Sequence, residues 1–116
     1  MNAPPSPGYL AVYGSLAPRQ RNHGQLRGIH GRWFRGEVEG DLRDRGGGAA
    51  GGFPGLTPRP GGPRVAVSVL ESCELAEAWE RLDAFEGDEY RRVQVPVFLE
   101  NGETICAHVY ALRSVT

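Results

Sequence analysis

The order of patterns between residues 64 and 112 most constrains how this 116-residue chain folds. Residues 64–71, RVAVSVLE, form a β-branched run that is typical of a strand. The segment 72–87 then carries one apolar stripe at helical spacing, made of Leu75, Ala78, Trp79, Leu82 and Phe85. Two further apolar runs flank Asn101-Gly102, a dipeptide that favours a hairpin turn. Strand, helix and hairpin in this order predict an α+β domain.

The helix has recognisable start and stop signals. Ser72 is a candidate N-cap, and Glu74 and Glu77 lie near the positive end of the helix dipole. Gly87 follows the last residue of the apolar stripe by two positions and is a natural C-terminal stop. These signals predict a helix over 72–87.

The N-terminal half predicts strands separated by glycine-rich connections. Residues 9–14, YLAVYG, indicate a strand buried on both faces. Residues 32–43 indicate one or two twisted strands with a bulge near Gly36 or Gly40. Residues 44–63 are dominated by Gly and Pro and predict one long loop. We expect a disordered lead over 1–8 and a single domain over 9–116, built on a mixed, barrel-like sheet.

Composition narrows the class of protein. A net charge of -1 and a pI of about 6.3 give no support for nucleic-acid binding. No window approaches the roughly 18 apolar residues that span a bilayer, and the Pro-rich start does not look like a signal peptide. Two cysteines favour free thiols in a reducing compartment. We therefore expect a cytoplasmic protein without membrane or nucleic-acid partners.

Several kinds of chemistry are excluded or left without support. All 13 basic residues are Arg, so a lysine nucleophile or Schiff base is excluded. The three histidines lack metal-ligand spacing, which predicts that there is no metal site. The glycine-rich loop lacks the Lys and Ser or Thr of a phosphate loop.

Gly14-Ser15 ends the first predicted strand abruptly. At such a sharp turn several backbone N–H groups can point outward together and bind an anion, and glycine lets a ligand approach the backbone closely. The alternative is an ordinary turn with a capping serine. The residues alone leave both interpretations open.

Glu86, towards the other end of the chain, occupies a position where an acidic side chain is unfavourable. It lies in the last turn of the predicted helix, where the dipole disfavours an acidic side chain. Partial burial beside Phe85 would raise its pKa and suit it to act as a base near neutral pH. The alternative is a solvated acidic helix end balanced by Arg91 and Arg92.

Five short motifs become specific in combination. They are VYGSL at 12–16, NH at 22–23, FPGL at 53–56, LDAFEGDEYRR at 82–92 and VYAL at 109–112. In this order the chain resembles the gamma-glutamylcyclotransferase-like family, which includes the AIG2-like proteins, over about residues 9–112. The resemblance implies a small mixed β-barrel with flanking short helices. It also implies a reaction in which a γ-glutamyl amide cyclises to 5-oxoproline and releases a free amine or amino acid.

The resemblance also implies roles for particular residues. Glu86 would be the catalytic acid and base. The backbone of residues 13–16 would hold the substrate α-carboxylate, and two tyrosines would line the pocket; these binding residues are Tyr13, Gly14, Ser15, Leu16, Tyr90 and Tyr110. No metal or cofactor is required, and we expect a monomer or a weak homodimer. The family often carries a Gly-Glu pair and an aromatic residue before the helix, which VAVSVLES lacks, so the leaving amine is not defined.

One variant of this function and two alternatives to it use the same residues. In the variant, the chain unmasks a γ-glutamyl-protected amine in a biosynthetic pathway. It could instead be a non-catalytic domain that senses a small carboxylate, although a sensor has no need of the base Glu86. In a purely structural or interaction module, the pocket at Glu86 would be collapsed or filled by side chains.

Overall fold

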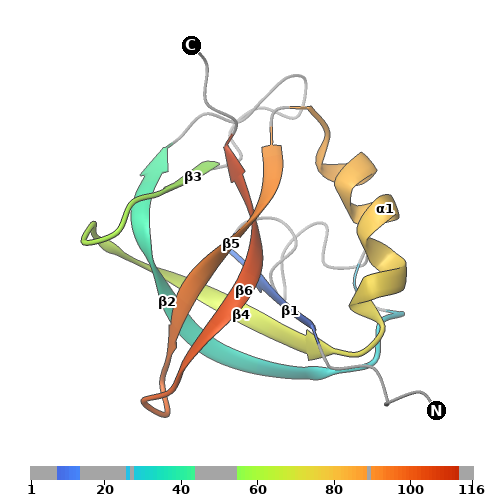
Figure 1. Ribbon diagram of the computed structural model, residues 1–116, viewed down its shortest axis with the longest axis horizontal. Helices are drawn as coiled ribbons and strands as arrows, with labels where there is room; N and C mark the ends of the chain where they lie inside the picture. Colours follow the sequence, from blue (N-terminus) through green and yellow to red (C-terminus); the bar gives the residue numbers. More distant parts are fainter. Residues whose placement is uncertain (1–7, 14–25, 27, 44–54, 89, 113–116) are drawn as a thin grey trace, which may run out of the picture.

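The computed structural model describes residues 8–13, 26, 28–43, 55–88 and 90–112. In these residues six strands and one helix follow one another along the chain (Figure 1). Their bounds are β1 Gly8–Val12, β2 Arg32–Arg43, β3 Gly55–Pro58, β4 Arg64–Ser72, α1 Leu75–Glu86, β5 Tyr90–Leu99 and β6 Thr104–Leu112. The predicted lead over 1–8 lies outside the described residues, except that Gly8 already belongs to β1.

Five strands close into a barrel. Each strand pairs with the next in the order β1, β4, β2, β5, β6, and β6 returns to β1. The short β3 lies between β2 and β6 as an additional strand. The β1–β6 and β3–β6 pairs are parallel and the other pairs are antiparallel. The fold is therefore the small mixed barrel that the sequence predicts.

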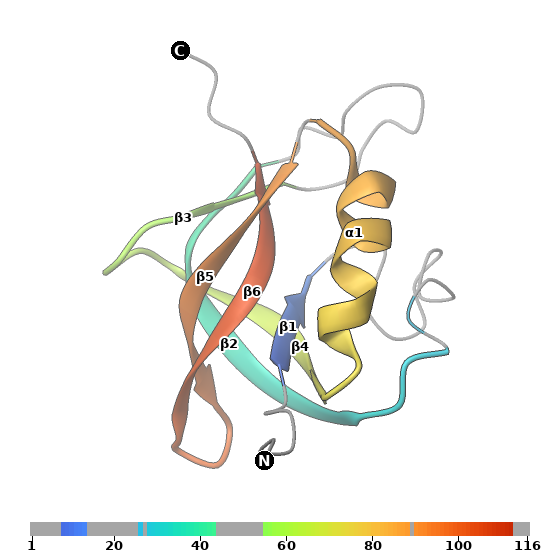
Figure 2. The ribbon, with the colours of Figure 1, turned by 45° about the vertical axis from the view of Figure 1, so that its right-hand side comes forward.

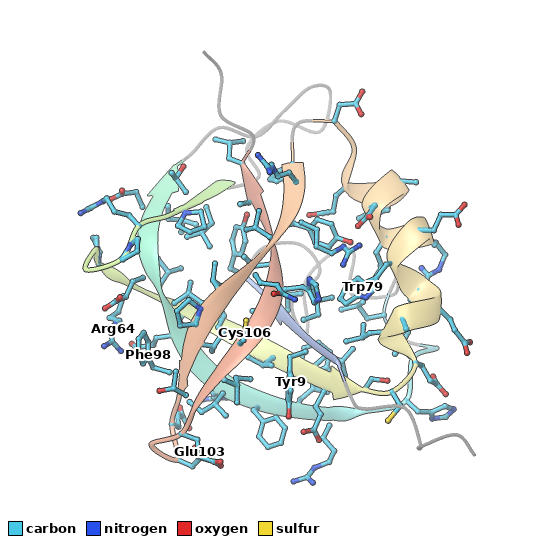
Figure 3. All side chains as sticks on the ribbon, in the orientation of Figure 1. Tyr9, Arg64, Trp79, Phe98, Glu103 and Cys106 are labelled. Carbon is cyan, nitrogen blue, oxygen red and sulfur yellow. The ribbon has the colours of Figure 1, made fainter. Side chains whose placement is uncertain are left out.

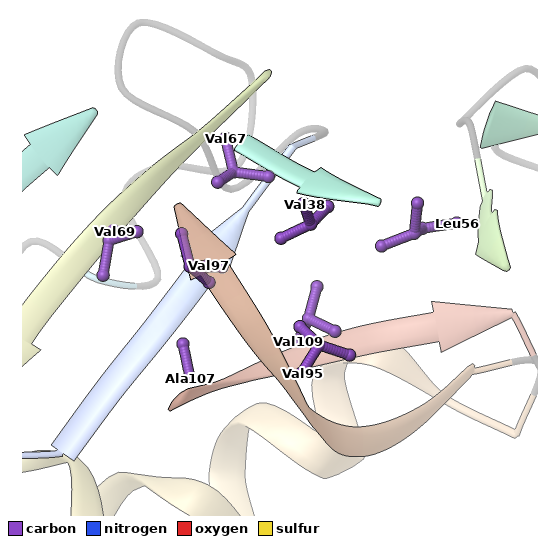
Figure 4. Close-up of a cluster of buried hydrophobic side chains, with 9 residues drawn as sticks. Val38, Leu56, Val67, Val69, Val95, Val97, Ala107 and Val109 are labelled. Carbon is purple, nitrogen blue, oxygen red and sulfur yellow. The ribbon is translucent and has the colours of Figure 1, made fainter. Parts of the chain in front are cut away.

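Small and β-branched side chains fill the inside of the barrel. Figure 4 shows this cluster, which consists of Ala11, Val38, Leu56, Val67, Val69, Val95, Val97, Ala107 and Val109. Alternation along the strands directs every second side chain to this interior. Five strands enclose little space, which explains why valine and alanine dominate.

A second apolar cluster attaches α1 to the outside of the barrel (Figure 2). Leu75, Ala78 and Leu82 of the predicted stripe are buried against β1, β4 and β6. Trp79 packs at the edge of this cluster, whereas Phe85 is 38% exposed. Phe85 is therefore wrongly placed in the stripe.

The start of the helix also differs from the prediction. Ser72 is the last residue of β4, and the helix begins at Leu75 with Glu74 as its N-cap. The Ser72 hydroxyl accepts a hydrogen bond from the Glu74 N–H at 3.0 Å and donates one to the His30 carbonyl. It therefore forms a turn that links β4 to the helix instead of capping it. Gly87 ends the helix as predicted, with a φ of 84°.

The predicted bulge in 32–43 is absent. β2 is one strand, and its pairing with β4 runs without interruption from Arg32 to Glu39. A Cβ at Gly36 would lie 2.9 Å from the Phe98 carbonyl oxygen, and one at Gly40 would lie 2.6 Å from the Thr57 carbonyl oxygen. These glycines permit close approach of neighbouring strands, which is the other reason for glycine in a strand.

The predicted loop over 44–63 contains β3, which is a further correction. Gly55–Pro58 pairs with β2 and β6, while 44–54 lies outside the described residues.

The hairpin at Asn101-Gly102 is confirmed, since β5 and β6 pair on both sides of it and Gly102 has a φ of 93°. Within the described residues no helix is long and apolar enough to cross a membrane.

Candidate active site

Glu86 ends α1 with its side chain partly buried. Burial raises the pKa of this carboxyl from 4.5 to about 7. Among the residues that the structure describes, no group hydrogen-bonds or forms a salt bridge with it. A partly buried carboxylate without a fixed partner can exchange protons near neutral pH, which is what a general acid or base requires.

Tyr13 lies directly after β1 and connects three strands. Its hydroxyl donates to the Tyr110 carbonyl oxygen of β6 at 2.5 Å and accepts from the Leu56 N–H of β3 at 3.0 Å. Burial raises the pKa of Tyr13, and the negative charge of Glu86 raises it further. The phenol is therefore neutral, and its hydrogen bonds fix the end of β1 against the barrel.

Tyr110 joins β6 to the helix. Its hydroxyl donates to Asp83 Oδ1 at 2.6 Å, one helical turn before Glu86. Burial and this hydrogen bond raise the pKa of Tyr110, with a smaller contribution from the charge of Glu86. Glu86 therefore lies within electrostatic reach of both Tyr13 and Tyr110.

Arg92 of β5 completes the contacts of Asp83. Its Nε lies 2.9 Å from Asp83 Oδ1, and its Nη2 lies 3.4 Å from Oδ2. Burial acts to raise the pKa of Asp83, but hydrogen bonds from Arg92 and Tyr110 bring it below its ordinary value. Asp83 is therefore ionised at neutral pH and serves as an acceptor for both partners.

Aromatic rings hold Arg92 in turn. The guanidinium lies 4.3 Å from the centre of the Trp79 ring, and its Nη1 is 3.3 Å from His108 Nδ1. The Trp79 and His108 rings are 4.6 Å apart. Figure 3 shows Trp79 on the side of α1 that faces the barrel. Burial and the charge of Arg92 lower the pKa of His108, which favours its neutral form.

The structure brings four of the predicted site residues into one region. Tyr90 packs against the same apolar cluster that contains Tyr110, and the negative charge of Glu86 raises the pKa of both Tyr13 and Tyr110. Gly14, Ser15 and Leu16 lie outside the described residues, as does His23, so the predicted anion-binding turn is not described beyond Tyr13.

Asp83 and Arg92 are the residues that sequence reasoning undervalued. Arg92 does balance the charge at the acidic end of the helix, as the alternative interpretation of Glu86 proposed. The carboxylate that it pairs with is Asp83, however, and not Glu86. The motif LDAFEG carries Asp83 three positions before Glu86, so both lie on one face of the helix. That spacing is the one signal in the sequence for their association.

A groove of about 920 Å³ lies elsewhere, lined by parts of β1, β2, β4 and β5. Tyr13 reaches one part of it, whereas Glu86, Tyr90 and Tyr110, all of them described, do not line it. At its other side the Arg64 guanidinium stacks on the Phe98 ring at 4.0 Å, far from α1 (Figure 3). No cluster of His, Cys, Asp and Glu that could hold a metal ion occurs in the described part of the chain.

In the described residues the fold is a small closed mixed barrel with one helix on its outside and a partly buried glutamate at the end of that helix. The family model described as gamma-glutamyl cyclotransferase, AIG2-like, matches residues 10–116. The chain therefore belongs to this family, and the resemblance carried by the motifs is confirmed.

Solved structures share the fold. An AIG2-like protein from Mus musculus is 26% identical with a TM-score of 0.71, covering 96% of this chain and 80% of that one. YkqA from Bacillus subtilis is 24% identical with a TM-score of 0.71, covering 92% of this chain but only 36% of the longer YkqA chain. A glutathione-specific gamma-glutamyl cyclotransferase from yeast is 16% identical with a TM-score of 0.65, covering 91% and 69%. No curated protein sequence matches this chain.

Proposed function

We propose that this protein is a gamma-glutamylcyclotransferase that converts a γ-glutamyl amide to 5-oxoproline and a free amine. The observation that carries the proposal is Glu86, a partly buried carboxyl with a pKa of about 7 in the region shared with Tyr13 and Tyr110. Family membership supports the reaction class. The identity of the released amine is to be determined by the substrate panel described below.

The proposed reaction begins with a proton transfer to Glu86. The substrate carries an α-ammonium group, which is a poor nucleophile until it loses a proton. The ionised Glu86 removes that proton, and the α-amine nitrogen attacks the γ-carbonyl carbon of the same molecule. A new C–N bond forms and the carbonyl oxygen takes up negative charge. Because the nucleophile is intramolecular, holding the substrate in the folded shape supplies much of the rate.

The second half of the reaction returns the proton. When the tetrahedral intermediate collapses, the bond between the γ-carbon and the amide nitrogen breaks. Protonated Glu86 donates to the departing nitrogen and is restored as a carboxylate. The ring nitrogen loses its second extra proton, which the released amine takes up to leave as an ammonium ion. One γ-glutamyl amide gives one 5-oxoproline and one amine, without net consumption of water. A carboxyl with a pKa near 7 suits both directions of transfer.

Substrate binding is assigned to the end of β1. We propose that backbone N–H groups of residues 13–16 hold the α-carboxylate, as the family motif implies, with Tyr90 and Tyr110 beside the γ-glutamyl chain. The Tyr13 hydroxyl, which already has two hydrogen bonds, is assigned to fixing this turn rather than to the substrate. We further propose that the protein works in the cytoplasm as a monomer or weak homodimer, without a cofactor.

The test is a panel of γ-glutamyl dipeptides, γ-glutamyl amines and glutathione, scored by mass spectrometry for 5-oxoproline. Glu86→Gln is the matched control because it keeps the size of the side chain and removes the titrating group. Turnover by the wild type that is lost in the variant supports the proposal, and the panel names the leaving amine. Thermal stabilisation by a γ-glutamyl compound without turnover would instead indicate a carboxylate-binding domain.

A further inference from the structure

The position of the Glu86 carboxyl depends on the helix that carries it. In the described part of the chain this carboxylate has neither a hydrogen-bond partner nor a counter-ion, so its orientation depends on the last turn of α1. That turn is attached to the barrel by the buried Leu82 and by Asp83, which lies three positions before Glu86 on the same face. The polar contacts of Asp83 therefore contribute to the position of the proposed base.

Two groups from two strands fix the Asp83 carboxylate. Tyr110 of β6 donates to Oδ1 at 2.6 Å, and Arg92 of β5 donates to Oδ1 at 2.9 Å and to Oδ2 at 3.4 Å. Arg92 is itself restrained by Trp79 and His108, and its side chain is only 24% exposed. The Asp83 side chain is 46% exposed, so the pair lies at the surface, and the contacts of Arg92 with Trp79 and His108 restrict its geometry.

The same chain of bonds continues to the other half of the proposed site. The Tyr110 carbonyl accepts the Tyr13 hydroxyl, which in turn accepts the Leu56 N–H. Tyr13 directly precedes Gly14, the first glycine of the predicted carboxylate-binding turn. Two hydrogen bonds, from Tyr110 to Asp83 and from Tyr13 to Tyr110, thus connect the last turn of α1 to the residue that precedes the predicted carboxylate-binding turn.

We infer that Asp83 is a positioning residue for the proposed cyclisation, because it ties the helical turn of Glu86 to Tyr110 and so to Tyr13. This inference rests on the proposed function. It assigns no contact with substrate to Asp83. Misplacement of a catalytic group by about 1 Å can cost about a hundredfold in rate, so a tie of this kind has a measurable effect on turnover.

The kinetic test compares Asp83→Asn, Tyr110→Phe and the double variant with the wild type. Asp83→Asn is expected to lower kcat about tenfold or more while KM changes by less than about threefold, because alignment of the base is lost and the carboxylate-binding turn is retained. The double variant is expected to be no slower than the slower single variant, since both break one connection. Glu80→Gln, which removes an exposed charge one turn earlier on α1, is the matched control and keeps wild-type kcat.

A second readout does not depend on turnover. The Glu86 carboxyl is titrated by ¹³C NMR in the wild type and in Tyr110→Phe, with Glu86→Gln to assign the signal. Among the described residues, the charge of Glu86 acts on Tyr13 after β1 and on Tyr110 of β6, and Asp83 lies one helical turn earlier on α1. Tyr110→Phe changes no charge, so a looser turn that admits water is expected to lower the pKa of Glu86 from about 7 by roughly one unit.

The two readouts separate the failure of this inference from the failure of the proposed function. If the wild type turns over no γ-glutamyl compound, the proposed function fails and the titration alone decides whether the tie positions Glu86. Wild-type kcat in Asp83→Asn, or an unchanged Glu86 titration in Tyr110→Phe, overturns the inference. A lowered kcat in Asp83→Asn together with a lowered Glu86 pKa in Tyr110→Phe supports it.

Discussion

Tyr13 illustrates how much one side chain contributes at the residue scale. Its hydroxyl is donor to β6 and acceptor from β3, so a single oxygen joins the end of β1 to two other strands. The residue belongs to the motif that the family shares, but its side chain contacts the barrel. The Tyr13 side chain therefore fixes the start of the backbone segment that is proposed to bind the substrate carboxylate.

Tyr13→Phe should lower the free energy of unfolding by about 1–3 kcal/mol, because it leaves the Leu56 N–H without its acceptor inside the barrel. Urea unfolding measures the difference. Tyr9→Phe is the matched control, since the Tyr9 hydroxyl donates only to the Glu71 side chain at 2.9 Å. An equal loss in both variants would contradict the role given to Tyr13.

The raised pKa of Glu86 predicts a pH dependence of the free energy of unfolding. Its pKa in the folded chain, about 7, lies above the ordinary 4.5, so the folded chain binds more protons between these values than the unfolded chain does. The contribution of this group to stability is therefore complete below about pH 4.5 and is lost as the pH rises through about 7.

Glu86→Gln removes that titration. Relative to wild type, its free energy of unfolding should rise by about 1–3 kcal/mol between about pH 4.5 and pH 8, as measured by urea unfolding at both values. A constant difference between variant and wild type across this range would show that Glu86 is not buried enough to matter.

At the scale of elements, β2 decides whether the barrel closes. It pairs with β4 along most of its length and also with β5, so Gly36 has Val67 on one side and Leu99 on the other. Its missing side chain lets the β5 backbone come close. The strand therefore needs glycine for proximity rather than for an unusual backbone angle.

Gly36→Ala should destabilise the protein by about 1–3 kcal/mol, because the added Cβ would meet the Phe98 carbonyl oxygen and Val97 Cγ1 at 2.9 Å each. Thermal unfolding with circular dichroism measures the effect. Gly28→Ala serves as the control, since no atom lies within 4 Å of its added Cβ. Unchanged stability in Gly36→Ala would mean that β2 and β5 can separate without cost.

For the whole molecule, the side chains inside the barrel form one of the two buried apolar clusters. Val97 is fully buried in the interior cluster, whereas Val93 on the same strand is only partly buried. Val97→Ala should cost about 2 kcal/mol and Val93→Ala about half as much, both measured by urea unfolding. Similar losses at the two positions would place the core elsewhere.

The sequence predicts this architecture unevenly, for physical reasons. Local patterns identify β4, α1 and the hairpin, because their signals lie within a few residues. β3 escapes detection because its four residues lie among glycines and prolines and are held by β2 and β6. Ser72 carries a capping signal, but pairing with β1 keeps it in a strand.

The candidate site is predictable only in part. Periodicity and local chemistry single out Glu86, and the family motifs add the tyrosines. The connection from Asp83 to Tyr110 spans 27 positions, and that from Tyr13 to Tyr110 spans 97, so no local pattern reveals them. Only the closed barrel brings these residues together.

The most direct test of Glu86 as the catalytic base is the pH dependence of kcat/KM for the best γ-glutamyl substrate, from about pH 5 to 8. A base must be ionised to act, so kcat/KM should fall on the acid side with a midpoint of about 7, the pKa of Glu86. Glu86→Gln should lose turnover by about a hundredfold or more and lose this limb. A flat profile, a midpoint near the ordinary 4.5, or an unchanged rate in Glu86→Gln would contradict the account.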